Sequence, residues 1–245
     1  MDNPSYISLS RQSGLLKELS VIANNMANAD TTGYKREGAI FTEYVKSVGS
    51  ARPSDNPRES MSMGRLGAHV SHFESGELRR TGGSLDVAID GEGFFLIETP
   101  QGERLSRAGH LMTDNEGTLI NASGFAVLDD AGGRIQIPQD VNLLAIGGDG
   151  TLSADGVELG KLGIVTAIPT DLSREGDNLW STENGYIPVD EPQVIQGFLE
   201  DSNVQPVAEI ARMIEVQRAY DAGQKLLEIE NDRIKSVITT VRQLT

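Results

Sequence analysis

The stretch PVAEIARMIEVQRAYDAGQKLLEIENDRIKSVITTVRQLT, residues 206–245, decides the fold of this chain. No proline follows Pro206, and positions alternately three and four residues apart are mostly apolar along the whole stretch. That spacing, kept over several heptads, is typical of a coiled-coil seam. We therefore predict a helix that starts near Asn203 or Gln205-Pro206 and extends for roughly 50–57 Å. The series consists of Met213, Val216, Tyr220, Gly223, Leu227, Glu230, Ile234, Val237, Val241 and Leu244.

A second helix is predicted at the N-terminal end, over residues 8–29. This segment contains no proline, and its apolar residues follow the spacing of one helical face. The Asp and the β-branched pair in residues 30–33 favour non-helical backbone, so the helix should stop there, with Gly33 as a left-handed cap. The residues on this face are Leu15, Leu19, Ile22, Met26 and Ala29.

The middle of the chain has the pattern of short strands. Leu85, Val87 and Ile89 alternate with polar or small residues, and FFLI at residues 94–97 is typical of a buried strand. Turn signals recur at intervals of about 8–12 residues, which indicates an antiparallel all-β domain. Residues 46–68 are rich in Ser, Pro, Gly and Arg and are expected to be a linker.

The predicted fold class is therefore α+β, with long N- and C-terminal helices forming a coiled-coil axial domain and an antiparallel all-β domain inserted between them. We assign residues 1–33 and 204–245 to the axial helical domain, 76–185 to the β-rich outer domain, and 34–75 and 186–203 to connecting segments. One pair of such helices cannot bury every apolar position, whereas many copies packed around an axis could. The pattern thus favours a helical polymer.

Composition excludes several classes of function. The formal net charge is −15, and the densest basic spots, Lys35-Arg36 and Arg79-Arg80, are too small for nucleic acid. No stretch approaches the roughly 20 apolar residues that span a bilayer, so we expect no membrane insertion. The opening residues MDNPSYISLSRQSG lack a basic start followed by an apolar run, so the protein should stay in the cytoplasm or leave without a cleaved signal.

No catalytic, cofactor or metal site is predicted. His69 and His72 are three residues apart, but neighbouring glycines favour extended backbone, on which the two side chains face opposite sides. Residues 147–150 lack the ligand spacing of a calcium loop and fit a hairpin turn better. Residues 90–93, DGEG, lack the lysine and following helix of a phosphate loop, so they should form a turn before a strand.

Four segments resemble signatures of the bacterial flagellar rod and hook protein family. They occur in the family's order and are ANNMANADTTGYK (residues 23–35), GGSLDVAIDGEGFFLI (82–97), LSRAGHLMTDNEGTLINASGFAVL (105–128) and GFLEDSNVQPVAEIARMIEVQRAYDAGQKLL (197–227). The short length and the opening PSYISLS (residues 4–10) most resemble the proximal rod members. MIEVQRAY (residues 213–220) is as close to the distal rod members.

The resemblance implies a structural, non-enzymatic subunit of the basal-body rod that polymerises helically and transmits torque from motor to hook. Implied partners are proximal and distal rod subunits, further copies of this chain, and the flagellar type III export apparatus. The implied location is the periplasmic rod, reached without a cleaved signal peptide, and no cofactor is implied. A distal rod or hook subunit is the alternative within the family.

We expect assembly contacts along both helical faces and at the asparagines near the first helix, since an amide that donates and accepts could fix the register between subunits. Ordinary helix-end capping is the simpler interpretation of those asparagines. The expected assembly residues are Leu15, Leu19, Ile22, Asn24, Asn25, Met26, Asn28, Thr32, Gly33, Met213, Val216, Tyr220, Leu227, Ile234, Val237 and Val241. A different class, a β-rich hydrolase with helical dimerisation arms, would leave both apolar faces unexplained.

Overall fold

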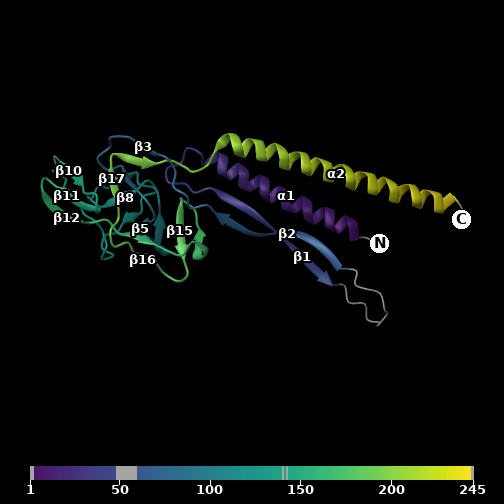
Figure 1. Cartoon of the computed structure of the whole chain (residues 1–245), viewed down its shortest axis with the longest axis horizontal. Helices are drawn as coiled ribbons and strands as arrows, with labels where there is room; N and C mark the ends of the chain where they lie inside the picture. The colour runs from purple at the N-terminus through teal and green to yellow at the C-terminus, as the bar shows by residue number, and fades with distance from the viewer. Residues whose placement is uncertain (1–2, 48–59, 140, 142, 244–245) are drawn as a thin grey trace. The chain divides into compact units, whose positions relative to one another are not determined.

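The computed structural model describes residues 3–47, 60–139, 141 and 143–243. The chain divides into two units (Figure 1). The helical unit comprises Met1–Ala27, Glu37–His72 and Gln205–Thr245, and the β unit comprises Asn28–Arg36 and Phe73–Val204. The segments 28–36 and 186–204 thus group with the β strands. The sequence had assigned residues 28–33 and 204 to the helical domain, and residues 34–36 and 186–203 to connecting segments.

The two predicted terminal helices are present. Helix α1 spans Asn3–Ala27 and helix α2 spans Pro206–Gln243, a length of 38 residues. They lie side by side and antiparallel (Figure 1). Helix α2 begins at the predicted proline, which needs no hydrogen bond in a first turn. Over the described residues, neither helix combines the length and apolar character needed to cross a membrane.

Helix α1 ends earlier than predicted, and Gly33 is not its cap. The helix stops at Ala27, and a turn follows in which Thr31 N–H donates to Asn28 O at 3.1 Å. Gly33 does have the predicted positive φ, +66°. Its N–H donates to the backbone oxygen of Glu200 at 2.7 Å, and an added Cβ would lie 2.4 Å from the Arg107 carbonyl carbon. Glycine is therefore needed here because two backbones approach closely.

A long hairpin occupies part of the predicted linker. Strand β1, Glu37–Ser47, pairs antiparallel with β2, Ser60–Ser71, and the register shifts between Ile40 and Phe41. Helix α1 contacts both strands. The linker prediction therefore differs from the structure at residues 60–68, which belong to a strand. Composition alone does not show that the backbone N–H and C=O groups of this segment are paired with those of β1. Residues 48–59 of the predicted linker lie outside the described residues.

The β unit is antiparallel in every strand pairing among its described residues, as predicted. Its main sheet has the strand order β14-β15-β6-β5-β9-β8-β7, and β13 joins β5 to β16. These strands are β14 (Leu172–Arg174), β15 (Leu179–Thr182), β6 (Gly102–Ser106), β5 (Phe94–Thr99), β9 (Ala126–Val127), β8 (Leu119–Asn121), β7 (Leu111–Thr113), β13 (Ile164–Thr166) and β16 (Ile187–Pro188).

Smaller sheets complete the β unit. Strands β10, β11 and β12 form one sheet, β17 pairs with β4, and β18 pairs with β3. A 3₁₀ turn at Pro169–Asp171 precedes β14. The strands are β3 (Leu78–Arg80), β4 (Val87–Ile89), β10 (Leu144–Ile146), β11 (Thr151–Ala154), β12 (Val157–Lys161), β17 (Val194–Gln196) and β18 (Phe198–Glu200). The turn predicted at residues 147–150 connects β10 to β11, and a turn at residues 155–156 connects β11 to β12.

Strand β5 is the centre of the core because both of its faces are buried. Phe95 and Ile97 join the larger apolar cluster, and Phe94 and Leu96 join a second cluster that contains Trp180. A strand buried on both faces needs a continuous apolar run, which is what residues 94–97 supply. Residues 90–93 form the predicted turn that leads into this strand.

We expect Gly109→Ala to lower the free energy of unfolding of the β unit by at least about 2 kcal/mol. An added Cβ at Gly109 would lie 1.6 Å from the backbone oxygen of Val87, whose N–H bonds to Gly109 O at 2.9 Å. The measurement is urea unfolding of the full chain followed by the fluorescence of Trp180, the single tryptophan, which is fully buried in this unit.

Gly176→Ala is the matched control. No atom lies within 4 Å of its added Cβ, and its φ is outside the left-handed region. The change in unfolding free energy should stay within about 0.5 kcal/mol. Equal losses in the two variants would contradict the close approach at Gly109.

Candidate assembly helices and a buried ion cluster

The helix pair is held by an apolar face with polar contacts at its edge. Ile22 of α1 and Val216 of α2 are buried. Gly223 brings the helices close together, since its added Cβ would lie 3.3 Å from the Gln12 amide nitrogen. Arg212 Nε donates to Glu18 Oε1 at 2.8 Å.

The predicted apolar face of α2 is covered only along part of its length. Val216 is buried, whereas Ile234, on the same face, is 46% exposed. With Gln12 beside Gly223, the antiparallel register brings Asn3, where α1 begins, opposite Asp232. Ile234 lies beyond that point. Met213, Tyr220 and Leu227 are partly buried, and the side chains of Val237 and Val241 lie outside the described residues.

Helix α1 shows the same division between a covered and an uncovered face. Leu15, Leu19 and Met26 are partly buried, like the predicted face of α2. Both helices also carry a second set of large apolar side chains that is solvent-exposed, which we call the outer apolar residues. The sequence analysis missed them because the heptad series selects one face only. They are Leu9, Leu16, Val207, Ile210, Ile214, Leu226 and Ile229.

The predicted asparagines have different surroundings. Asn25 is fully buried, and its amide both donates to Glu37 O at 2.8 Å and accepts from Glu37 N–H at 2.9 Å. Asn25 therefore holds the start of β1 within its own chain. Asn24 is exposed, and Asn28 accepts from the Thr31 hydroxyl at 3.2 Å.

The remaining two predicted residues, Thr32 and Gly33, belong to the β unit. The Thr32 carbonyl accepts from Asn178 Nδ2 at 3.0 Å. Next to it, the guanidinium of Arg174 lies between two aromatic rings, 4.1 Å from the centroid of Tyr34 and 4.6 Å from that of Trp180. Such cation–π contacts are strong when they are shielded from water. They attach the segment 28–36 to the strands.

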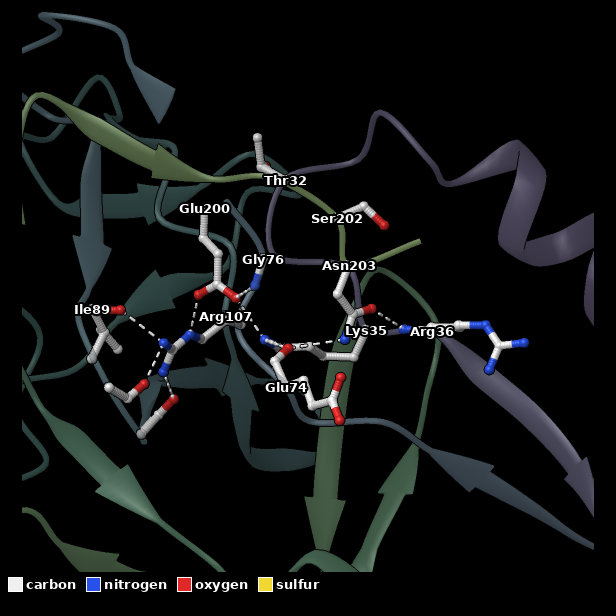
Figure 2. A network of polar contacts seen from close by, with 12 residues as sticks. Thr32, Lys35, Arg36, Glu74, Gly76, Ile89, Arg107, Glu200, Ser202 and Asn203 are labelled. Carbon is white, nitrogen blue, oxygen red and sulfur yellow. Dashed lines mark hydrogen bonds and ion pairs between the residues drawn. The ribbon is translucent and has the colours of Figure 1, made fainter. Parts of the chain in front are cut away.

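The β unit contains a buried ion cluster (Figure 2). Glu200, at the end of β18, accepts hydrogen bonds on one carboxylate oxygen from Lys35 Nζ at 2.6 Å and from Gly76 N–H at 2.9 Å. Its other oxygen accepts from Arg107 Nε. All three charged side chains are at least nine-tenths buried. One carboxylate thus links three segments that are far apart in the sequence.

The two cations extend the cluster to backbone oxygens. Arg107 donates to the carbonyls of Ile89, Gly91 and Gly93, so it holds the turn that leads into β5. Lys35 Nζ donates to Glu74 O at 2.9 Å. Figure 2 shows the two side chains approaching Glu200 from opposite sides.

Asn203 forms further hydrogen bonds to the segment 28–36. Its side chain accepts from Arg36 N–H at 2.6 Å and donates to Glu74 O at 2.9 Å. Its own N–H donates to Tyr34 O at 3.3 Å. The segments 34–36 and 200–203 are therefore joined by side-chain and backbone bonds together.

Electrostatics favour the ionised form of Glu200. Burial by itself would raise the pKa of its carboxyl group, but the charges and hydrogen bonds of Arg107 and Lys35 outweigh burial and lower the pKa below 4.5. Burial is also the largest effect on Lys35 and lowers its pKa, because the charge of Glu200 offsets it only in part. Glu200 therefore stabilises the folded state at neutral pH, and this contribution is lost as pH falls through its folded pKa.

This cluster was not predicted from the sequence. Lys35 stood out only as part of a small basic spot, and no role was predicted for Arg107 or Glu200. The available signal was position, since these residues lie in three of the four segments that carry the family resemblance. Among the residues that the structure describes, no three His, Asp or Glu side chains gather as metal ligands.

Comparison with known proteins identifies the family. The chain is 40% identical over 244 residues to the flagellar basal-body rod protein FlgF of Caulobacter vibrioides, and the match covers 97% of both chains. The chain belongs to the flagellar basal-body rod protein family. It is also 30% identical to FlgF of Rhizobium meliloti over 98% of both chains, and 32% identical to FlgG of Bacillus subtilis over 97% of this chain and 98% of that protein.

Three family models match this rod protein in order. Residues 6–35 match "Flagella basal body rod protein", 88–154 match "Flagellar hook protein FlgE/F/G D1 domain", and 195–240 match "Flagellar basal body rod FlgEFG protein C-terminal". The predicted family is confirmed. The protein is a structural subunit of the flagellar basal-body rod and not an enzyme, which removes the hydrolase alternative.

Glu200→Gln should destabilise the β unit of this rod protein by roughly 3–5 kcal/mol at neutral pH, because two buried cations lose their counter-charge. The loss should shrink as pH falls through the lowered pKa of Glu200 in the folded protein, because the wild-type carboxyl group then becomes protonated too. Urea unfolding followed by Trp180 fluorescence at several pH values measures both effects. A pH-independent difference between the two proteins would show that the charge of Glu200 is not what stabilises the unit.

Asn25→Ala should lower the stability of the helical unit by about 1–3 kcal/mol, because it removes the two hydrogen bonds that the buried Asn25 amide makes to the backbone of Glu37. Asn24→Ala, at the exposed neighbouring position, should have a clearly smaller effect. The measurement is thermal unfolding of the full chain followed by circular dichroism at 222 nm. If both substitutions shift the helical transition equally, Asn25 does not hold the start of β1.

Proposed function

We propose that this chain is a subunit of the proximal rod that polymerises helically and transmits torque from the motor to the hook. In this proposal the helical unit forms the axial part of the rod and the β unit its outer part. The proposal rests on the outer apolar residues. Exposed apolar side chains that extend over both helices are typical of a surface that another protein covers.

The helix pair supports packing between copies. Helix α2 extends past the described start of α1, and Ile234 is exposed in the extended part although it continues the covered face. We propose that helices of adjoining subunits cover this extension and the outer apolar residues, and that they form a coiled coil with it. Burial of one such side chain contributes about 1.5–3 kcal/mol, and a polymer repeats that gain in every copy.

The proposed partners are proximal and distal rod subunits, other copies of this chain, and the flagellar type III export apparatus. The proposed location is the periplasmic rod. Export without a cleaved signal stays a prediction, which N-terminal sequencing of the protein recovered from purified basal bodies tests directly. A processed N-terminus in that material would refute it.

A distal rod position is the second candidate, because the chain also matches FlgG of Bacillus subtilis over nearly its whole length. The two positions differ in their order along the rod. Labelling of purified basal bodies with an antibody against this chain should mark the end of the rod nearer the motor. A label nearer the hook would favour the distal position.

Ile214→Asp should abolish rod completion and swimming without unfolding the protein. The side chain is 44% exposed in the single chain, so the subunit tolerates a charge there, whereas a covered assembly surface would not. Swimming in soft agar and the yield of intact rods measure assembly. Circular dichroism and Trp180 fluorescence of the purified variant check the fold.

Gln217→Asp is the matched control on the same helix. Its side chain is exposed and already polar, so the substitution forfeits no apolar burial and should change stability by only about 0.5 kcal/mol. Cells with this variant should swim normally. If Ile214→Asp cells swim as well as Gln217→Asp cells, the outer apolar residues are not an assembly surface.

A further inference from the structure

The buried ion cluster has two basic side chains for one carboxylate. Among the described residues, Lys35 and Arg107 form ion pairs only with the carboxylate of Glu200. The relative exposures of the three side chains are 2–3%, so solvent screens the excess charge poorly. An unbalanced charge in such surroundings is costly unless an anion or further acceptors approach it.

Both cations also have a spare hydrogen-bond donor. An ammonium group has three N–H donors, and Lys35 uses two of them, on Glu200 and Glu74. A guanidinium group has five, and Arg107 uses four, one on Glu200 and three on backbone carbonyls. Within the described part of the chain, one N–H of each side chain thus has no acceptor.

The two cations line the same cavity. It has a volume of about 130 Å³ and is partly open to solvent. That volume exceeds the roughly 30 Å³ of one water molecule and admits a small organic group. The rest of the wall combines the apolar side chains of Phe73, Phe94 and Leu172 with polar ones, among them the exposed Glu92, its one acidic side chain.

We propose that this cavity is a binding site for a carboxylate group on a short apolar stem. One negative charge matches the single excess positive charge, and carboxylate oxygens are good acceptors for both ammonium and guanidinium donors. The aromatic and aliphatic side chains in the wall favour an organic stem over a fully hydrated anion such as sulfate. The group comes from a free small carboxylate or from an acidic side chain of an adjoining subunit.

Acetate is the probe for the first source. In about 0.2 M acetate the Tm of the full chain, followed by Trp180 fluorescence, should rise by about 1–3 °C relative to chloride at equal ionic strength. The shift should saturate with acetate concentration, as binding to one site requires. A Tm that does not distinguish acetate from chloride, or a shift that rises linearly without saturation, would overturn the proposal.

Two variants test the place of binding. Ala167→Leu fills the cavity at its wall without changing a charge, and it should abolish the acetate shift. Ala145→Leu, in β10 and outside the cavity, should keep it. Glu92→Gln removes the acidic group at the wall and leaves the packing intact, so it should strengthen acetate binding severalfold at low ionic strength, where screening is weak. An acetate shift that survives Ala167→Leu would overturn the proposal.

The Glu92→Gln variant keeps the proposal testable if Ala167→Leu does not fold, because equal acetate affinity in wild type and Glu92→Gln would also contradict the site. Rod assembly then separates the two sources. If Ala167→Leu melts normally in chloride but forms no rods, the carboxylate belongs to an adjoining subunit. If that variant forms rods and only the acetate shift is lost, the ligand is a free small carboxylate.

Discussion

One buried carboxylate links the β unit's distant segments. Glu200 accepts hydrogen bonds from Lys35, which lies 165 positions earlier in the chain, and from Arg107 and Gly76. Closing such long loops has an entropic cost that must be met by strong contacts. Charge-assisted hydrogen bonds shielded from water are among the strongest available. The carboxylate therefore joins the segment 28–36, the last strand and the turn before β5 at a single point.

A polar centre of this kind has a different physical role from the apolar core beside it. The apolar clusters around Phe95 and Trp180 stabilise the β unit by burial, and volume-conserving substitutions there are tolerated. In the ion cluster a single substitution is costly, because each charged group depends on the others. Buried ion pairs of this type often add little net stability, but loss of one partner is severely destabilising. In this chain the cluster specifies which segments meet.

The helical unit differs from the β unit in the large apolar side chains that it exposes. Its two helices bury one apolar face against each other and leave a second set of large apolar side chains in solvent. A monomeric protein gains nothing from that exposure, whereas a rod subunit needs surfaces that remain available until assembly. Within the helical unit, specific contacts such as Asn25 with Glu37 set the geometry, and the outer apolar residues remain exposed.

The sequence by itself determined the two helices, their order around an antiparallel β region, and the family. These depend on local periodicity, as in the series that includes Val216 and Leu227, and on segments that keep their family pattern. Tertiary structure alone decided that β2 pairs with β1 and that Lys35, Arg107 and Glu200 meet. It also decided that Gly33 allows two backbone segments to approach closely and does not cap a helix. Contacts between residues far apart in the chain leave no periodic pattern in the sequence. A single charged residue also looks the same in the sequence whether it is solvated or buried against a partner.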